Sequence, residues 1–204
     1  MKLIVVTNDQ MPIQKLTETL LIIEPYIDAV ILREKSKTDS EVFDLIRKLT
    51  LAGFERTKII VHGRADLATL TNSQKVQLPG HGLPLPLLKD HFPALSFGRS
   101  VHSYQEAMRA TDDGAHWILY GHLYETGSKT GLPPRGIAEL SKIATTLSIP
   151  VYAIGGIKPK HINNLRSLGV AGVTVMSSIF GRDSPMTAVK TYYDAIHFKR
   201  GNFS

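Results

Sequence analysis

Two segments near the end of the chain, VYAIGGI at residues 151–157 and GVTVMSSI at residues 172–179, decide the fold. Each is an apolar run of strand length that ends in small residues, Gly155 and Gly156 in the first and Ser177 and Ser178 in the second. Small residues at neighbouring strand ends leave backbone N–H groups open, and such groups bind anions. In a (βα)8 barrel, the loops after the seventh and eighth strands are the usual phosphate site. The two segments therefore predict both a barrel and an anionic ligand.

Working outward from these segments, apolar runs of strand length recur along the whole chain. The eight runs are Leu3–Val6, Ala29–Leu32, Lys58–Val61, Val76–Leu78, Leu95–Gly98, Trp117–Tyr120, Val151–Ile154 and Val173–Met176. Most are continuous rather than alternating, which is typical of parallel strands buried on both faces. The segments between them have helical periodicity, as in the stripe Val42, Leu45, Ile46 and Leu49. We predict an α/β fold, a single-domain (βα)8 TIM barrel over residues 1–204, with an open doubly wound sheet as the alternative.

Local signals support this division of the chain. The segment 79–86 is rich in proline and glycine, so the helix after it must be short. Ser103 and Glu106 have the spacing of a capping box and predict a helix start. Pro159 is placed early in a helix that Gly169 can end.

Composition narrows the class of protein. The net charge of +6 comes from 24 Lys and Arg against 18 Asp and Glu. The basic residues are scattered, so we attribute the excess to attraction for a small anionic ligand and expect no nucleic-acid partner. The chain has no cysteine, which excludes disulfides and thiolate metal sites. It shows no signal peptide and no apolar stretch long enough for a membrane span, so we expect a cytoplasmic protein without a membrane partner.

Charged residues follow the second predicted strand. Arg33 and Lys35 alternate along the chain, so we expect only one of them to face the pocket. We favour Arg33 as the anion clamp, because its guanidinium fork matches a carboxylate or a phosphate. The alternative is a rim salt bridge from Arg33 to Glu34 or Asp66.

The segment 124–131 combines hydroxyl groups, glycines and one lysine. Thr126, Ser128 and Lys129 could therefore close over an anionic substrate, with Lys129 as a point charge. The alternative is an ordinary surface loop.

Histidines follow three of the predicted strands. His122 comes directly after Gly121 and is the favoured proton-transfer group, since histidine exchanges protons near neutral pH. His62 and His102 lie on the same predicted face. A histidine at such a position more often has a structural role than a functional one, so we favour both less than His122 as functional residues. Three histidines would suit zinc, but no HxH pair or carboxylate at ligand spacing supports a metal site. Walker A, GxGxxG and GxSxG motifs are all missing, so nucleotide cradles and serine nucleophiles of those kinds are unsupported.

Five motifs, taken in chain order, resemble those of the thiamin phosphate synthase superfamily. They are LREK at 32–35, GRSVH at 98–102, YGHLYET at 120–126 with Ser128 and Lys129, IGGI at 154–157 and VMSSI at 175–179. Each is weak alone, but together they cover nearly the whole chain. The resemblance implies a (βα)8 barrel that binds a thiazole phosphate.

The chain departs from that superfamily where the synthases bind Mg²⁺. The synthases have Asn-Asp after the third strand and an acidic stretch after the fourth, whereas this chain has His62-Gly63 and Gly80-His81-Gly82. The glutamine that the family carries before Leu-Arg on the second strand is Ile31. Departure of pyrophosphate needs Mg²⁺ to neutralise the leaving charge, so a chain without both carboxylates should not run the synthase reaction. His122 stands where the synthases typically have proline.

This combination is similar to the TenI-type thiazole tautomerases of the superfamily. The resemblance implies an isomerase of thiamin biosynthesis that needs no metal and no cofactor and aromatises a carboxythiazole phosphate by a proton shift. It assigns His122 to acid/base catalysis and Gly155, Gly156, Ser177 and Ser178 to the phosphate. The candidates for the ring and the carboxylate are Arg33, Ser100, Thr126, Ser128 and Lys129.

Two alternatives stay open beside the tautomerase. One is a synthase-like transferase, and the other is a non-catalytic regulatory or ligand-binding protein on an inherited barrel. Thiazole synthase, which makes the substrate, is a candidate partner. The sequence leaves the oligomeric state undecided, with a homo-oligomer as one option.

Overall fold

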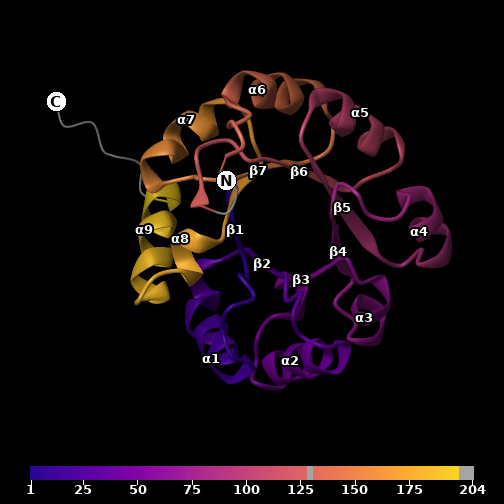
Figure 1. Cartoon of the computed structure of the whole chain (residues 1–204), viewed down its shortest axis with the longest axis vertical. Coiled ribbons are helices and arrows are strands. Elements are labelled where there is room, and N and C mark those ends of the chain that lie inside the picture. Colours follow the sequence, from indigo (N-terminus) through magenta and orange to yellow (C-terminus); the bar gives the residue numbers. More distant parts are fainter. Residues whose placement is uncertain (128–130, 198–204) are drawn as a thin grey trace.

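Eight parallel strands close into a barrel in the computed structural model, which describes residues 1–127 and 131–197. Each strand pairs with its neighbour in chain order, and β1 pairs with β8 to close the ring (Figure 1). The strands are β1 (Lys2–Val6), β2 (Ala29–Leu32), β3 (Ile59–His62), β4 (Lys75–Leu78), β5 (Ser96–Val101), β6 (Trp117–Gly121), β7 (Val151–Ile154) and β8 (Gly172–Val175). The predicted TIM barrel is confirmed, and the open doubly wound sheet is wrong.

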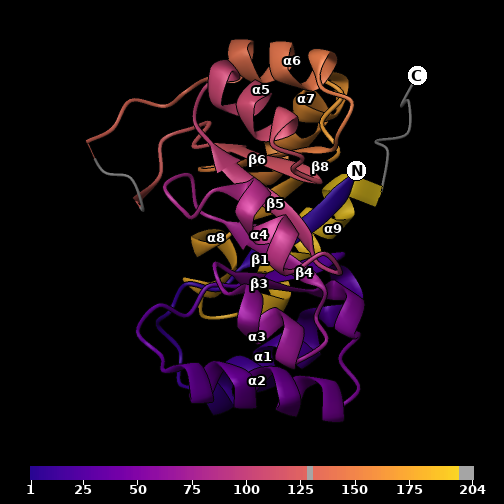
Figure 2. The same ribbon diagram turned by 90° about the vertical axis from the view of Figure 1, so that its right-hand side faces the viewer.

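Helices form an outer layer around the strands. They are α1 (Ile13–Ile23), α2 (Asp39–Leu51), α3 (Ala65–Leu70), α4 (Leu85–His91), α5 (Tyr104–Asp112), α6 (Ile137–Thr146), α7 (Ile162–Ser167), α8 (Ser177–Phe180) and α9 (Pro185–His197), with short 3-10 turns at η1 (Glu24–Tyr26), η2 (Arg56–Lys58) and η4 (Pro159–His161). Figure 2 shows α5, α6 and α7 on one side of the strands and α1, α2 and α3 on the other. As expected from its proline-rich approach, α4 is only 7 residues long.

The strands are buried on both faces because each face meets a different core. Outward-facing residues such as Val173 and Val175 pack with the helices in the main hydrophobic cluster. Inward-facing residues fill the barrel as a second cluster that includes Ile4, Ile31 and Leu119. This double burial explains why the strand sequences are continuous apolar runs. The predicted stripe on α2 is buried as well, and a capping box at Thr38 starts that helix.

The end of β5 and the start of α5 differ from the predictions. β5 continues to Val101 instead of stopping at Gly98, because Arg99 and Val101 pair with residues of β6. Ser103 accepts a hydrogen bond from the Glu106 backbone N–H, but the Glu106 carboxylate accepts from the His102 backbone N–H. The predicted capping box is therefore only half formed, and its glutamate fixes His102 instead.

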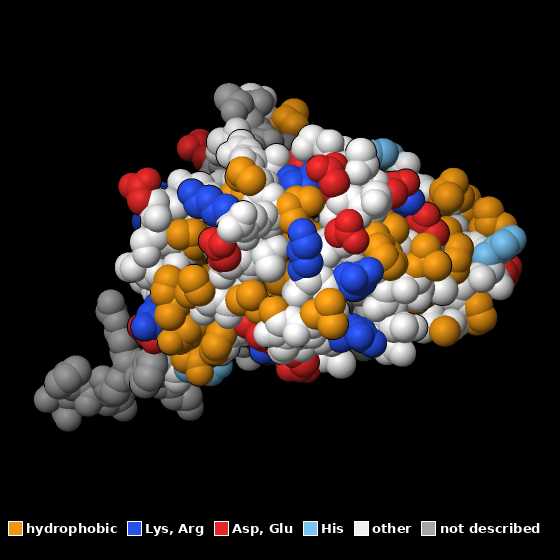
Figure 3. All heavy atoms as spheres, turned by 90° about the horizontal axis from the view of Figure 1, so that it is seen from below, with side chains coloured by type: hydrophobic (Ala, Val, Ile, Leu, Met, Phe, Trp, Pro, Cys, Tyr) orange, Lys and Arg blue, Asp and Glu red, His pale blue; other side chains and the backbone are white. Residues whose placement is uncertain are grey.

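The charged side chains are mixed on the face drawn in Figure 3, where Lys and Arg alternate with Asp and Glu. A mixed surface of this kind lacks the single-sign field that draws in nucleic acid. Absence of a nucleic-acid partner stays a prediction. None of the helices in the described part of the chain has both the length and the apolarity that crossing a membrane requires.

Candidate active site

A cavity of about 1070 Å³ opens at the carboxyl ends of the strands. Eight of the ten predicted site residues line it: Arg33, Ser100, His122, Thr126, Gly155, Gly156, Ser177 and Ser178. The other two, Ser128 and Lys129, lie outside the described residues. His62 and His102 line the same cavity. The fold therefore brings together residues that are up to 145 positions apart in the sequence (33 to 178).

The ends of β7 and β8 form one side of this cavity, which we call the phosphate cup (Gly155, Gly156, Ser177 and Ser178). Within the described residues, none of their four backbone N–H groups has a hydrogen-bond acceptor. Gly155 and Gly156 both have positive φ, at 100° and 65°, which favours glycine at each position. Unpaired N–H groups on a left-handed turn are suited to an anion. Binding of phosphate there stays a prediction.

The glycines of the phosphate cup have a second role that the sequence did not reveal. A Cβ added at Gly155 would overlap the Cβ of His122, and one at Gly156 would overlap the carbonyl oxygen of Glu125. The chain after β6 runs this close because the N–H of Leu123 donates to the carbonyl of Ile154 (3.0 Å). The N–H of Tyr124 donates in the same way to Gly155 (3.0 Å). The backbone therefore ties His122 directly to the phosphate cup.

His122 is buried at the end of β6 and is only 7% exposed. Its Nε2 lies 3.2 Å from the carbonyl oxygen of Leu132. Because a carbonyl oxygen can only accept, we assign the proton to Nε2, which leaves Nδ1 with a free lone pair. The N–H of Arg135 donates to the His122 carbonyl at 2.9 Å and fixes the backbone. His122 can therefore accept a proton at Nδ1.

His102 forms a hydrogen bond to the backbone just before His122. Its Nδ1 donates to the carbonyl oxygen of Gly121, and the Gly121–His122 peptide bond is cis. Its own backbone N–H donates to Glu106 at 2.7 Å. With Nδ1 protonated, Nε2 of His102 is the nitrogen with the free lone pair.

Both Arg33 and Lys35 line the cavity, so the prediction that only one of them would face it is wrong. β2 ends at Leu32, and strict alternation of side chains does not extend beyond a strand. The rim salt bridge considered for Arg33 is also wrong. Glu34 pairs with Lys37 and Asp66 pairs with Arg64. The N–H of Arg33 donates to the buried Thr7 hydroxyl (2.8 Å), which anchors the residue.

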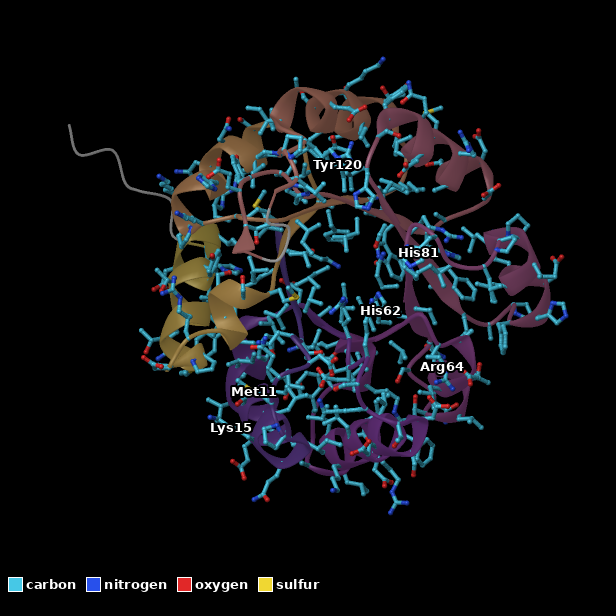
Figure 4. The ribbon with its side chains drawn as sticks, viewed as in Figure 1. Met11, Lys15, His62, Arg64, His81 and Tyr120 are labelled. Atoms are coloured by element: carbon cyan, nitrogen blue, oxygen red, sulfur yellow. The ribbon has the colours of Figure 1, made fainter. Side chains whose placement is uncertain are left out.

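His62 lies at the end of β3, near the centre of the ring in Figure 4, while Arg64 lies farther out toward α3. Burial, followed by the charges of Arg33 and Lys35 and by His81, lowers the pKa of His62 to about 4. The imidazole of His62 is therefore neutral at neutral pH. The low pKa reflects burial first and the nearby positive charges second, and those charges suit an anionic ligand.

The side chains at the synthase metal positions do not fit Mg²⁺. This ion takes oxygen ligands, mainly carboxylates, whereas His62 and His81 offer imidazoles. Within residues 1–127 and 131–197, no group of three His, Asp or Glu side chains is arranged to hold a metal ion. The acidic residues that line the cavity, Glu125 and Asp183, lie in loops after β6 and α8.

A buried network that holds Ser100 was missed by the sequence reasoning. The indole N–H of Trp117 donates to the Gln77 side-chain oxygen (2.8 Å), and the Gln77 amide donates to the Ser100 hydroxyl (3.0 Å). The indole occupies the space where Gly98 would carry a Cβ. Because Ser100 accepts from Gln77, its own O–H is free to donate into the cavity. A glutamine in an apolar strand was the only sequence signal for this network.

These features define a class: (βα)8-barrel proteins with a cavity at the carboxyl ends of their strands that is lined by basic side chains and open backbone N–H groups. A family model described as thiamine monophosphate synthase matches residues 3–179. The chain therefore belongs to the thiamine monophosphate synthase family, whose members are enzymes of thiamine biosynthesis.

Named relatives agree with this family. The chain is 37% identical over 134 residues to a thiamine-phosphate synthase of Chlorobium luteolum, covering 65% of this chain and 63% of that protein. It is 32% identical over 194 residues to the synthase of Chlorobium phaeovibrioides, covering 92% and 90%. The structure matches a thiamine phosphate pyrophosphorylase from Pyrococcus furiosus with a TM-score of 0.82 and 27% identity, covering 96% of this chain and 95% of that one. All three are named for the synthase reaction, so they support the family and not its tautomerase branch.

Proposed function

We propose that this protein is a thiazole tautomerase, an isomerase that aromatises a carboxythiazole phosphate. The observation that carries the proposal is the placement of His122, which is buried beside the phosphate cup with a free lone pair on Nδ1. The proposal includes a catalytic role for His122 and ligand-binding roles for the other predicted site residues.

The proposed reaction moves one proton and needs no other reactant. Nδ1 of His122 takes a proton from an sp³ ring carbon, and the C–H electron pair enters the ring as a new π bond. The exocyclic double bond of the substrate shifts its electrons to its outer carbon, which takes the proton back from Nδ1. The product has the same atoms as the substrate and an aromatic ring. Proton transfer by a positioned histidine contributes about 10²–10⁴ in rate.

The charged groups of the cavity have separate tasks in this proposal. The phosphate cup holds the phosphate with backbone N–H groups. Arg33 and Lys35 hold the carboxylate and stabilise negative charge as it spreads through the ring. The neutral His62 adds no charge of its own.

The test replaces His122 with Gln and follows conversion of the non-aromatic tautomer by NMR. We expect at least a hundredfold loss of turnover with binding of inorganic phosphate unchanged. His91→Gln is the matched control, because His91 is exposed on α4 and does not line the cavity. Full activity of the His122 variant would overturn the mechanism.

The second candidate is thiamin phosphate synthesis, which the names of the relatives favour. It predicts that the protein joins a pyrimidine pyrophosphate to a thiazole phosphate when Mg²⁺ is present. Since the side chains at the metal positions do not fit Mg²⁺, we expect no thiamin phosphate. Its formation at rates dependent on Mg²⁺ would replace the tautomerase proposal.

The tautomerase proposal also covers the compartment of the protein and the source of its substrate. The protein would work in the cytoplasm and receive its substrate from thiazole synthase. Co-purification of the two proteins, or direct transfer of substrate between them, tests this part.

A further inference from the structure

One polar atom at the base of the cavity has no partner. Among the described residues, only Thr174 Oγ1 and Glu34 Oε1 are buried side-chain oxygens without a hydrogen bond. Glu34 pairs through its other oxygen with Lys37 and lines a separate cavity of about 240 Å³. Thr174 is fully buried and lines the main cavity. Buried polar groups are nearly always hydrogen-bonded, so this hydroxyl calls for an explanation.

Thr174 faces the inside of the barrel. On the same strand, Val173 and Val175 belong to the outer core, and alternation turns Thr174 inward. Its partners on the adjacent strands are Ile4 and Ile154, both on the inner side. Neither offers a hydrogen bond from its side chain. Valine would fill this position equally well, so packing does not account for the hydroxyl.

The position of Thr174 along β8 relates it to the phosphate cup. It lies one residue before the end of β8 and is fully buried, whereas Ser177, the first residue of α8, is exposed, and both line the cavity. A ligand whose phosphate lies in the cup and whose other end reaches the buried side of the cavity would therefore contact Thr174.

We propose that Thr174 is a substrate-contacting residue, whose hydroxyl donates to an acceptor at the ring end of the ligand. This inference rests on the proposed function for the class of ligand, a heteroaromatic ring with a phosphorylated side chain. The inner-core side chains that line the cavity, including Val6, Ile31 and Leu119, are apolar. Among these apolar side chains the Thr174 hydroxyl supplies a directional contact, which helps to orient a flat ring.

The test compares Thr174→Val, which keeps the shape, with Thr174→Ser, which keeps the hydroxyl. The ligands are a thiazole phosphate and inorganic phosphate, with dissociation constants measured by calorimetry. We expect Thr174→Val to weaken thiazole phosphate about 5- to 20-fold, the effect of one buried hydrogen bond, and to leave inorganic phosphate unchanged. Thr174→Ser should bind both ligands within about threefold of the unmodified protein.

Thermal unfolding without ligand separates this role from a structural one. Removal of an unsatisfied buried hydroxyl should leave the Tm of Thr174→Val unchanged or raise it. A lower Tm would mean that the hydroxyl serves the fold and would overturn the inference. The control is Thr145→Val, an exposed threonine on α6.

The remaining outcomes are also decisive. Unchanged affinity of Thr174→Val for thiazole phosphate would overturn the inference, and so would equal weakening of both ligands. If Thr174→Val selectively loses thiazole phosphate while the unmodified protein shows no tautomerase turnover, the inference stands and the proposed function fails. If the unmodified protein turns over and Thr174→Val matches it in binding and rate, the inference alone fails.

Discussion

The two halves of the cavity are built differently. The β7–β8 half presents backbone N–H groups from glycine and serine, whereas the β2–β6 half presents side chains such as Arg33, Ser100 and His122. Backbone groups bind any phosphate of suitable size, so the first half is compatible with a synthase, a tautomerase or a binding protein. The reaction depends on the second half. Membership of the family therefore indicates which group of the substrate is bound, the phosphate, better than it indicates which reaction follows.

The largest expected effect comes from the backbone half. Gly156→Ala puts a Cβ against the Glu125 carbonyl at a φ of 65°. We expect a loss of about 2–4 kcal/mol in the free energy of unfolding and at least a tenfold weaker binding of inorganic phosphate. Urea unfolding and calorimetry measure the two effects.

Gly169→Ala is the matched control, because Gly169 also has a positive φ, 79°, but open space around it. It should lose only about 1 kcal/mol. Equal losses in the two variants would mean that backbone strain, and not the packing of the chain after β6, requires the glycine at position 156.

The next effect tests the environment of His62 in the side-chain half, where burial and nearby positive charges lower its pKa. Its pKa is about 4 in the folded protein, below its ordinary value of 6.5. As the pH falls from 6.5, the unfolded chain takes up the proton first, so stability should fall between pH 6.5 and 4, on the order of 2–3 kcal/mol. His62→Gln should remove that part of the pH dependence, as measured by urea unfolding at several pH values. An unchanged pH slope, with exposed His91→Gln as control, would contradict this account.

A smaller effect separates the two cations at the end of β2. Arg33→Gln and Lys35→Gln should each weaken a thiazole phosphate that carries a carboxylate about tenfold and inorganic phosphate much less. Lys15→Gln, an exposed residue on α1 labelled in Figure 4, is the control. If Lys35→Gln binds as the unmodified protein does, only Arg33 acts on the ligand, although both residues line the cavity.

The smallest effect belongs to one hydroxyl. Ser100→Ala should weaken the same carboxylated ligand about threefold, because one hydrogen bond to the ligand is lost. Binding of inorganic phosphate should not change, since Ser100 lies in the side-chain half. Exposed Ser40→Ala serves as control. A larger loss for inorganic phosphate than for the carboxylated ligand would place Ser100 at the phosphate instead.

The barrel could be predicted because its strands are short, apolar and evenly spaced. The residues at the strand ends followed from the architecture, and the structure brings Arg33, Ser100 and His122 to one cavity. The irregular backbone after Leu32 could not be foreseen, so the prediction that only one of Arg33 and Lys35 would face the cavity was wrong. Residues inside the barrel were missed for a different reason. Gln77 and Thr174 sit in ordinary strand sequences, and only the three-dimensional contacts show that one is fully bonded and the other is not.

The backbone bonds from Leu123 to Ile154 and from Tyr124 to Gly155 join the proposed base to the phosphate cup without a flexible side chain between them. The backbone fixes the spacing between the two, so under the proposed function the site would select ligands by their length. Substrates with one methylene more or fewer between ring and phosphate would still be held by the phosphate. Their rings would be displaced from His122, so such analogues should act as inhibitors that bind without being converted.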